Sequence, residues 1–353
     1  KTINYYIKEV IMKKIKNYNK NNFIKKLFIK VCRIIGYEII DQNNFTFPVS
    51  GKNSNDNLSV LGKSAISIPL GETKITRPVK SLDIILKTCT SVNLVTQSKK
   101  RIFEKDKAEY TFRTIKSLIN SLNFNKDIFD KINVCFFVID HKSKKEDLVL
   151  IKKMMQESSF KHEIIELDIN DFPQIKTINK NNPTIESNMK ATMASIFTSF
   201  QVAKKNSNDL IYFVEDDYIH KKESLGEMIL AYEKIASETN KELFLCPVDY
   251  PYLYKSLDRT NILIGNKYHW RIVKESLLTF MTSRLMVDKY LDKLLSMSEN
   301  ENSPFETALH NIYENETCLS PIPSLAMHCT NVNSVFGLSP NINWKKIWDE
   351  NKI

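Results

Sequence analysis

Between residues 81 and 217 the chain alternates short apolar runs with stretches of helical periodicity. Apolar runs at 82–86, 133–140, 163–167 and 209–214 lack a helical period and therefore predict buried strands. Apolar residues at helical spacing over 112–122, 151–155 and 189–200 predict the intervening helices. Strands that alternate with helices in this way predict an α/β fold with a doubly wound, mostly parallel sheet.

The pattern after residue 217 is less regular. Helices are expected over 225–235 and 284–295, a strand over 242–249, and a further helix that begins near Glu306. Aromatic residues gather in this part, at 250–254 and at 268–271. We therefore expect one domain over 81–330, with a first half at 81–217, a second half at 218–330 and a C-terminal tail at 331–353.

Residues 1–40 form a basic arm. Of the chain's net charge of +10, this arm holds +8, because ten Lys and Arg residues stand against two Glu. The rest of the chain is close to neutral, which argues against a nucleic-acid-binding body whose basic residues spread over one face.

The arm also carries an amphipathic helical pattern. Its apolar positions recur at helical spacing, and its basic positions fall mostly elsewhere; the apolar set is Ile24, Leu27, Phe28, Val31 and Ile35, and the basic set is Lys25, Lys26, Lys30 and Arg33. Each Lys or Arg near an anionic leaflet contributes about 1 kcal/mol, so we expect residues 12–36 to bind an anionic membrane surface. The alternative is a helix that packs on its own domain and leaves its lysines solvated. Residues 41–80, rich in Asn, Ser, Gly and Pro, are expected to form an irregular connector.

Several features predict the compartment. No apolar run is long enough to span a bilayer, and the N-terminal region lacks the uncharged core of a signal peptide. The six cysteines stand singly in mostly apolar surroundings, which favours reduced core residues over disulfides or a zinc site. We expect a cytoplasmic protein, peripheral on the inner face of the cell membrane, with Met12 as a plausible natural start.

The most informative segment is 209–218, an apolar run that ends in Glu215, Asp216 and Asp217. A buried strand in an α/β sheet delivers its last residues to the crevice where ligands bind. Oxygen-rich sites suit Mg²⁺ or Mn²⁺, and carboxylates together with phosphate oxygens are their usual shell. The alternative is that Asp216 or Asp217 caps the next helix.

The segment from Asn188 through the acidic strand resembles the lead-in to the metal-binding motif of nucleotide-sugar glycosyltransferases with the GT-A fold. The family pattern is Asp-x-Asp, whereas this chain has Glu215-Asp216-Asp217, which keeps an acid at each outer position. The resemblance covers roughly residues 81–329 in the order of elements, and it implies a GT-A-like sheet. It also implies that Asp217 binds the metal that bridges the donor diphosphate, with Glu215 beside it and Asp216 near the ribose.

The same resemblance implies further donor contacts. Thr88, after the first strand, and Asp140, after the next, are implied contacts of the nucleotide base, although Thr88 could equally satisfy its own backbone. Asn188 and Lys190 precede or begin the helix before the acidic strand, where Lys190 could neutralise the diphosphate or remain a solvated lysine.

His328 is the implied final metal ligand. Many members of the superfamily carry a late histidine that completes the metal shell, and residues 324–328 resemble that segment. A neutral imidazole can bind Mn²⁺, while a lone histidine after an apolar residue can also be a packed core residue.

Glycosyl transfer with inversion needs a general base near the acceptor hydroxyl. Glu306 lies where the family often places its base, although Ser303 to Glu306 also reads as a capping box. Asp249 is the second candidate, and if neither serves, the enzyme would retain configuration. The acceptor itself is expected to contact aromatic and polar side chains of the second half, namely Tyr250, Tyr252, His269, Trp270 and Arg271, which could instead be core residues.

The sequence thus favours a metal-dependent glycosyltransferase that uses Mn²⁺ or Mg²⁺ and acts on a glycan or glycolipid acceptor in cell-envelope polysaccharide or lipopolysaccharide synthesis. Two alternatives stay open. A sugar-phosphate nucleotidyltransferase shares the sheet but normally has a Gly-rich phosphate loop after the first strand, where this chain has no glycine. A membrane-surface binding protein would use its acids only structurally.

Overall fold

The computed structural model describes residues 23–37, 73–91, 101–178, 182–255, 259–301, 305–330 and 342–353. The chain divides into two compact units, residues 1–72 and residues 73–353. In the first unit the described part is α2 (Phe23–Ile34) and the three residues that follow it. The predicted arm before residue 23 and the predicted connector over 41–72 lie outside the described residues.

The second unit contains the predicted alternation of strands and helices. Its strands are β1 (Ser81–Thr88), β2 (Asn133–Asp140), β3 (Lys161–Glu166), β4 (Leu210–Glu215), β5 (Tyr218–His220), β6 (Phe244–Leu245), β7 (Ile262–Ile264), β8 (His269–Val273), β9 (Phe280–Ser283), β10 (Cys318–Ile322) and β11 (Ala326–His328). Its α-helices are α3 (Lys107–Phe124), α4 (Lys126–Phe129), α5 (Lys145–Glu157), α6 (Pro183–Asn206), α7 (Ser224–Thr239), α8 (Arg284–Ser296), α9 (Thr307–Tyr313) and α10 (Trp344–Glu350). Two 3₁₀ turns, η1 (Ile169–Asp171) and η2 (Pro251–Lys255), complete the described elements.

The main sheet has the strand order β3-β2-β1-β4-β9-β6-β10-β8-β7 within the described residues. Strands β3, β2, β1 and β4 are parallel to one another, as the sequence predicts for the first half. Beyond them, β9 runs antiparallel to both β4 and β6, and β8 runs antiparallel to β10 and β7. The predicted α/β class is confirmed, with a sheet that is parallel in its first half and mixed in its second.

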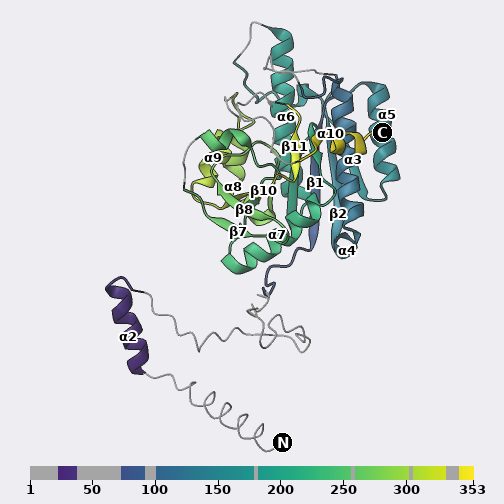
Figure 1. Ribbon diagram of the computed structural model, residues 1–353. Coiled ribbons are helices and arrows are strands. Elements are labelled where there is room, and N and C mark those ends of the chain that lie inside the picture. Colours follow the sequence, from purple (N-terminus) through teal and green to yellow (C-terminus); the bar gives the residue numbers. More distant parts are fainter. Residues whose placement is uncertain are drawn as a thin grey trace, which may run out of the picture. The chain divides into compact units, whose positions relative to one another are not determined.

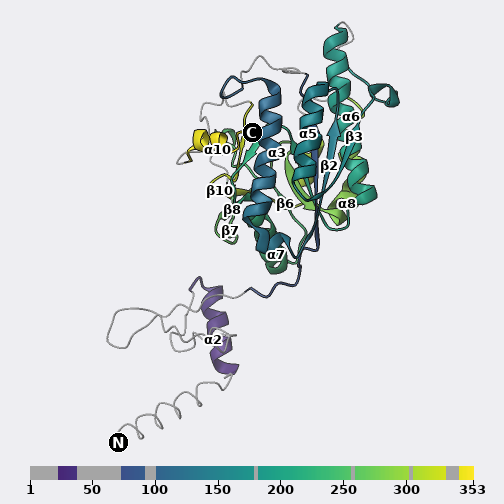
Figure 2. The ribbon, with the colours of Figure 1, turned by 90° about the vertical axis from the view of Figure 1, so that its right-hand side faces the viewer.

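Helices cover both faces of the sheet (Figures 1 and 2). Successive side chains of a strand point to opposite faces, so each face packs against its own helices. Leu82, Ile84 and Leu86 of β1 pack in one apolar cluster with residues of α3, α5 and α7. Ile85 packs in another, with residues of α6, α8 and α9. Because both faces are covered, β1, β2 and β4 are apolar along their length rather than alternating, which is why they read as continuous runs.

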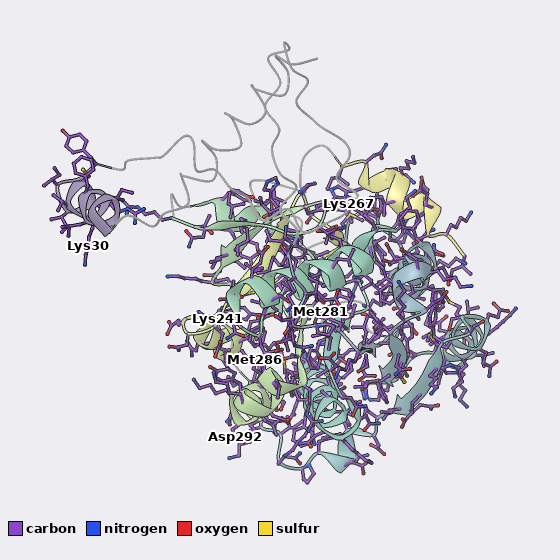
Figure 3. The ribbon with its side chains drawn as sticks, turned by 90° about the horizontal axis from the view of Figure 1, so that it is seen from below. Lys30, Lys241, Lys267, Met281, Met286 and Asp292 are labelled. Carbon is purple, nitrogen blue, oxygen red and sulfur yellow. The ribbon has the colours of Figure 1, made fainter. Side chains whose placement is uncertain are left out.

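The core and the surface follow the usual division of residue types (Figure 3). Met281 of β9 and Met286 of α8 are buried, whereas Lys241, Lys267 and Asp292 are exposed. Within the described residues, no helix is both long and apolar enough to cross a bilayer.

A second, two-stranded sheet forms beside the main one. β5 pairs antiparallel with β11, and the register sets Tyr218 opposite His328. Ile219 and Met327 are buried together with Trp344 and Trp348 of α10. This small sheet brings together two segments that lie more than a hundred residues apart in the sequence.

Two expectations about the second half need correction. The predicted strand over 242–249 is only the two-residue β6, because the chain then leaves the main sheet: the carbonyl of Pro247 accepts hydrogen bonds from the N–H groups of Leu325 and Ala326. Of the segment 331–353, expected as a tail, the described residues 342–353 contain α10, whose Trp348 is buried against Tyr110 of α3.

Candidate functional site

The three acids lie where β4 leaves the sheet. β4 ends at Glu215, a turn holds Asp216 and Asp217, and β5 begins at Tyr218. The next helix, α7, begins only at Ser224 and has Glu223 at its N-cap. The alternative that Asp216 or Asp217 caps the next helix is therefore wrong, and their placement needs another explanation.

Asp217 meets His328 at this turn. His328 Nε2 lies 3.4 Å from Asp217 Oδ2, and the Thr330 hydroxyl donates a hydrogen bond to the same oxygen. The imidazole stacks on the ring of Tyr218, with centroids 4.5 Å apart and an angle of 13° between the planes. The N–H of Cys329 donates to the backbone carbonyl of Asp217, which fixes the two segments to each other.

Burial and charge oppose each other in this pair. Burial alone would raise the pKa of Asp217, but His328, Lys107 and Thr330 outweigh it and hold that pKa well below its usual range. Burial would lower the pKa of His328, but the Asp217 carboxylate outweighs it and raises the pKa. Each of the two side chains therefore favours the charged form of the other.

Asp216 makes a separate set of contacts. Its carboxylate forms an ion pair with the buried Lys107, accepts a hydrogen bond of 2.7 Å from the Thr111 hydroxyl, and accepts one of 3.1 Å from the Cys89 N–H. These contacts tie the turn after β4 to α3 and to the end of β1. Both oxygens of Asp216 are therefore engaged by the protein itself rather than directed at a ribose.

Glu215 is half-buried and lies near two other charged side chains. Lys87 Nζ is 3.3 Å from its Oε1, and the Glu215 N–H donates to Thr279 Oγ1 at 3.1 Å. Burial is the main cause of the raised pKa of Glu306, and the negative charge of Glu215 is the next. Glu306 thus lies close enough to Glu215 for the two charges to interact.

The N-terminus of α9 differs from the capping box that the sequence predicts. α9 begins at Thr307, so Glu306 occupies the N-cap position, and its side chain makes no capping hydrogen bond. Ser303, the other partner of the predicted box, lies outside the described residues. Within the described residues, the carboxylate of Glu306 therefore does not cap α9.

The ends of β1 and β2 bring Thr88 and Asp140 together. The Thr88 hydroxyl donates to Asp140 Oδ1 at 2.7 Å, and the hydroxyl and N–H of Ser143 donate to the same carboxylate. Beside them, His141 is buried, and its Nδ1 has no hydrogen-bond partner among the described residues. The two predicted base contacts are thus neighbours, with their polar atoms bonded to each other.

α6 begins at the same edge of the sheet. Asn182 caps it by accepting hydrogen bonds from the N–H groups of Thr184 and Ile185, and Lys142, just after β2, lies 3.5 Å from the Ser187 hydroxyl. The predicted donor contacts Asn188 and Lys190 follow in the next turn of α6, and both are half-buried. They share this edge with Asp140, although no contact joins them to the acids.

The predicted acceptor residues do not form one cluster. Tyr250 is buried, and its hydroxyl is 2.8 Å from that of Tyr218, next to His328. Tyr252 packs against Tyr250, with ring centroids 5.4 Å apart. Burial is the main cause of the raised pKa of Tyr252, and Glu275 and Glu306 contribute to it. These two tyrosines therefore lie beside the candidate site.

The other three lie elsewhere. Trp270 is fully buried in the core, with its indole N–H directed at Glu227 3.4 Å away, and so offers no face to a ligand. His269 is exposed at the start of β8. Arg271 is buried and donates to Asp249 through Nε at 3.0 Å and NH2 at 2.7 Å.

Asp249, the second candidate base, is fully engaged by this contact. Its other oxygen accepts from the Tyr254 hydroxyl at 2.7 Å, and the guanidinium of Arg271 stacks over the Tyr254 ring. A carboxylate in a buried ion pair is a poor proton acceptor, because taking up a proton would leave the arginine charge uncompensated.

Sequence reasoning missed four residues of this site: Lys107, Thr111, Tyr218 and Thr330. Lys107 and Thr111 stand one turn apart on the first turns of α3, on the same face of the helix. That spacing was visible in the sequence, but nothing in it showed that this face meets the turn after β4.

The predicted metal ligands only partly converge. No group of three or more His, Cys, Asp or Glu side chains in the described residues is arranged to hold a metal ion. Asp217 and His328 do supply one oxygen and one nitrogen donor close together. This donor pair suits Mn²⁺ in a site where phosphate oxygens complete the shell.

No protein-family model matches the chain, and no curated protein matches it. Among solved structures, TarS residues 1–349 from S. aureus is 12% identical with a TM-score of 0.39, covering 68% of this chain and 57% of that one. The galactosyltransferase LgtC, in complex with donor and acceptor sugar analogs, is 11% identical with a TM-score of 0.31, covering 67% of each chain.

A UDP-glucose pyrophosphorylase in complex with UDP-glucose is also similar, with 7% identity and a TM-score of 0.38, covering 77% of this chain and 97% of that one. The solved structures thus include glycosyltransferases, the class that the sequence predicts, and a pyrophosphorylase, which belongs to the class weighed as an alternative. At these TM-scores the likenesses carry no argument for function, which rests on the residues of this chain.

Proposed function

We propose that this protein is a metal-dependent glycosyltransferase that moves a sugar from a nucleoside diphosphate sugar to a glycan or glycolipid acceptor. The observation that carries the proposal is the meeting of Asp217 and His328 where β4 leaves the sheet. A buried carboxylate and imidazole with lysines nearby, at the edge where α/β sheets bind ligands, suit a diphosphate with its divalent cation.

In this proposal Asp217 and His328 would hold Mn²⁺ or Mg²⁺, with Glu215 beside them. A bound divalent ion supplies neutralisation of the charge on the departing diphosphate. Lys87 and Lys107 add positive charge at the same place, which helps to orient the donor. Thr88, Asp140, Asn188 and Lys190 share the edge of the sheet and are proposed to surround the nucleoside.

Glu306 is proposed as the general base. Its raised pKa makes it a better proton acceptor near neutral pH than an ordinary glutamate. As an acceptor hydroxyl attacks the anomeric carbon, the new C–O bond forms, the bond to the diphosphate breaks, and Glu306 takes the hydroxyl proton. This sequence inverts the configuration. Tyr252, near Glu306, is proposed to contact the acceptor.

Binding of nucleoside diphosphates tests the proposal. UDP and GDP, each with Mn²⁺, are expected to raise the melting temperature of the protein, and nucleotide-sugars screened in the same way identify the donor. Asp217→Asn is expected to abolish the Mn²⁺-dependent part of the shift, whereas Asp292→Asn, at an exposed acid of α8, keeps it. A protein that responds to no nucleoside diphosphate with metal would contradict the proposal and favour a binding protein.

A transfer assay separates the two enzyme classes. Release of UDP or GDP from a nucleotide-sugar supports the transferase, and Glu306→Gln is expected to lower kcat by roughly 10²-fold or more with little change in donor binding. Release of pyrophosphate from a nucleoside triphosphate and a sugar phosphate would instead identify a nucleotidyltransferase.

We also propose that α2 places the enzyme on an anionic membrane surface. The described side chains of α2 and the turn after it include large exposed apolar residues: Leu27, Phe28, Val31, Ile34 and Ile35. The helix sequence has four basic residues and no acidic one. An exposed apolar stripe on a purely basic helix matches the interface of an anionic leaflet.

Sedimentation with vesicles tests this placement. The full chain is expected to sediment with phosphatidylglycerol-containing vesicles and to stay in solution with purely zwitterionic ones. Phe28→Glu is expected to reduce binding strongly, while Val149→Glu, at an exposed apolar residue of α5, leaves it unchanged. Equal sedimentation of a chain without residues 12–36 would exclude this role of the arm.

A further inference from the structure

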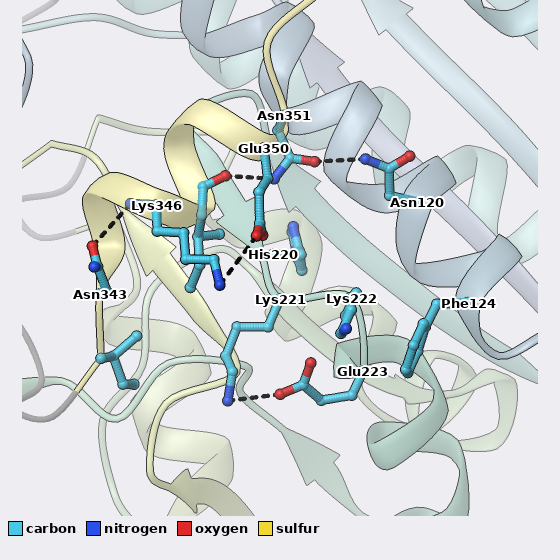
Figure 4. Close-up of a pocket in the computed structure, with 12 residues that line it drawn as sticks. Asn120, Phe124, His220, Lys221, Lys222, Glu223, Asn343, Lys346, Glu350 and Asn351 are labelled. Atoms are coloured by element: carbon cyan, nitrogen blue, oxygen red, sulfur yellow. Dashed lines mark hydrogen bonds and ion pairs between the residues drawn. The ribbon is translucent and has the colours of Figure 1, made fainter.

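A cavity away from the acids opens between α3, the segment after β5, and α10 (Figure 4). Its volume is about 550 Å³, within the range of sites for small ligands. It is lined by Asn120, Phe124, His220, Lys221, Lys222, Glu223, Ile342, Asn343, Lys346, Ile347, Glu350 and Asn351. None of these residues has a part in the proposed transfer.

The charge of the lining is positive. Three ammonium groups from two parts of the chain face the cavity, against two carboxylates (Figure 4). Lys221 is paired with Glu223 at 2.9 Å, and Lys346 lies 3.7 Å from Glu350. Lys222 forms no ion pair in the described part of the chain, and its Nζ lies 4.7 Å from the ring centre of Phe124. One positive charge is therefore left for a ligand to compensate.

The remaining lining suits hydroxyl groups and a flat apolar surface. Asn120 and Asn343 line the cavity, and amides can both donate to and accept from sugar hydroxyls. Asn351 is buried and holds the wall in place, because its Oδ1 accepts from Asn120 Nδ2 at 2.9 Å and its Nδ2 donates to the Ile347 carbonyl at 2.8 Å. Asn343 Oδ1 accepts from the Lys346 N–H, so its Nδ2 is the atom that can donate to a ligand. Phe124 is 54% exposed at the last residue of α3, so one face of its ring is open to a ligand. Aromatic faces provide large apolar contact area, and sugar rings present such flat apolar surfaces to them.

The floor of the cavity is neutral and rigid. His220 is buried, its Nε2 is 2.6 Å from the Tyr212 hydroxyl, and its Nδ1 is 3.3 Å from the Ser117 hydroxyl. Burial lowers the pKa of His220 to about 3, so the imidazole adds no charge near neutral pH. The positive charge of the cavity therefore comes from its lysines alone.

We propose that this cavity binds an anionic saccharide, that is, a sugar unit that carries a phosphate or a carboxylate. Lys222 and Lys346 would bind the anionic group, Asn120 and Asn343 the hydroxyls, and Phe124 the ring face. A cavity with positive charge alone would suit a simple anion equally well. This cavity combines positive charge with hydroxyl-binding groups and an aromatic face, which together suit a charged sugar.

The cavity is connected to the candidate active site through β5. Asp217 precedes β5, and His220 ends it, so the strand spans only ~10 Å between the two. This step rests on the proposed function: the saccharide in the cavity would be a distal unit of the acceptor, held while another unit reacts. An anionic glycan of several units could then be positioned by both sites.

Titration of the full chain with small probes tests the inference. By calorimetry, glucose 6-phosphate and glucuronic acid are expected to bind more tightly than glucose or inorganic phosphate. The binding is expected to persist in the presence of saturating UDP and Mn²⁺, because the cavity lies apart from the acids. Equal affinity for inorganic phosphate and glucose 6-phosphate would contradict the proposal of a saccharide site and would indicate a site for simple anions.

Matched variants locate the binding. Lys222→Gln and Lys346→Gln are each expected to weaken glucose 6-phosphate binding about fivefold, the loss of one charge-assisted contact. Lys345→Gln is the control, because Lys345 is on the same helix, pairs with Asp349 and does not line the cavity. Phe124→Ala is expected to weaken the binding of glucose 6-phosphate but not of phosphate. All four side chains are exposed, so folding is not at risk.

The two proposals fail in distinguishable ways. Asp217→Asn is expected to abolish transfer and to leave the binding of glucose 6-phosphate unchanged. If Lys222→Gln and Lys346→Gln bind the probe as well as Lys345→Gln does, the cavity is not a saccharide site, whatever the outcome of the transfer assay.

Discussion

The three adjacent acids have three different environments, and their identities alone did not reveal this. Glu215 is half-buried beside Lys87, Asp216 is bonded to α3 and β1, and Asp217 is paired with His328. Only Asp217 and Glu215 keep a relation to a ligand in the proposed mechanism. Asp216 instead holds the turn in place.

Removal of one contact of Asp216 is expected to destabilise the fold. Thr111→Val deletes the hydroxyl that donates to Asp216 and leaves a buried carboxylate oxygen less well satisfied, at a cost of about 1–3 kcal/mol in the free energy of unfolding. Thr114→Val is the control, since the buried Thr114 hydroxyl oxygen has no partner among the described residues. Urea unfolding of both variants measures the difference, and equal stability would contradict the role of Asp216.

Asp83 in β1 is expected to make stability depend on pH. Burial raises the pKa of Asp83 to about 6, above the ordinary value of 3.8, so the folded state binds this proton more tightly than the unfolded state does. The resulting stabilisation is fully present below about pH 4 and is lost as the pH rises through 6. The loss is roughly 3 kcal/mol over that window.

Asp83→Asn removes this titration. As the pH rises from 4 to 7, we expect the variant to become more stable relative to the parent protein, because only the parent loses the stabilisation that Asp83 provides. Urea denaturation at each pH measures the free energy of unfolding of both proteins. A difference that stays constant over this range would show that Asp83 keeps an ordinary pKa when the protein is folded.

At the scale of elements, α10 shows how a short helix can be held by one large side chain. Trp348 is buried between the rings of Phe103 and Tyr110, and the guanidinium of Arg113 lies 4.2 Å from its ring centre. Seven residues are too few for a helix that is stable alone, so its packing must supply the stability.

Trp348→Ala is expected to lower the free energy of unfolding by about 3–5 kcal/mol, the usual cost of deleting a large buried aromatic. Lys345→Ala, at an exposed residue of the same helix, is expected to change it by less than about 0.5 kcal/mol. Thermal unfolding followed by circular dichroism compares the two, and similar melting temperatures would contradict the anchoring role of Trp348.

Elements were predictable where apolar pattern and length agree. β1, β2 and β4 are covered on both faces, so their sequences are continuous apolar runs, and α3 and α6 are long enough to show helical periodicity. β6 was overestimated because Pro247 turns the chain away from the sheet. β5 and β11 have three residues each, too few for any periodicity to be visible.

The site was predictable only in part, because local sequence patterns do not show which distant segments meet. The acids and His328 could be named because an α/β strand carries its last residues to an edge. Their meeting depends on the pairing of β5 with β11, a long-range contact that no local pattern records. Arg271 and Trp270 were assigned to an acceptor site because a stretch of aromatic and basic residues has the same sequence pattern in a protein core as in a binding site.

At the scale of the whole molecule, the second unit contains the four apolar clusters that the described residues form, which span residues 79–348. The first residues of the second unit contact its later residues: Arg77 forms ion pairs with Glu242 and Asp209, and the Thr73 hydroxyl donates a hydrogen bond to Glu238. The boundary of the folded domain therefore lies before residue 73 rather than at residue 81.

A fragment of residues 73–353 is expected to unfold cooperatively on its own. A fragment of residues 81–353 loses the Arg77 contacts and is expected to melt about 2–4 °C lower, since partly buried ion pairs of this kind contribute on the order of 1–2 kcal/mol. Calorimetry on both fragments checks the boundary, and equal melting temperatures would show that residues 73–80 contribute nothing.

The pairing of β5 with β11 also bears on how the protein is made. A ribosome completes the acidic turn at Asp217 more than a hundred residues before it adds His328, and the carboxylate has no imidazole partner during that interval. The nascent chain can build the parallel half of its sheet early, while the centre proposed for catalysis is completed only after β11 has emerged. The proposed activity therefore requires that translation has passed this strand.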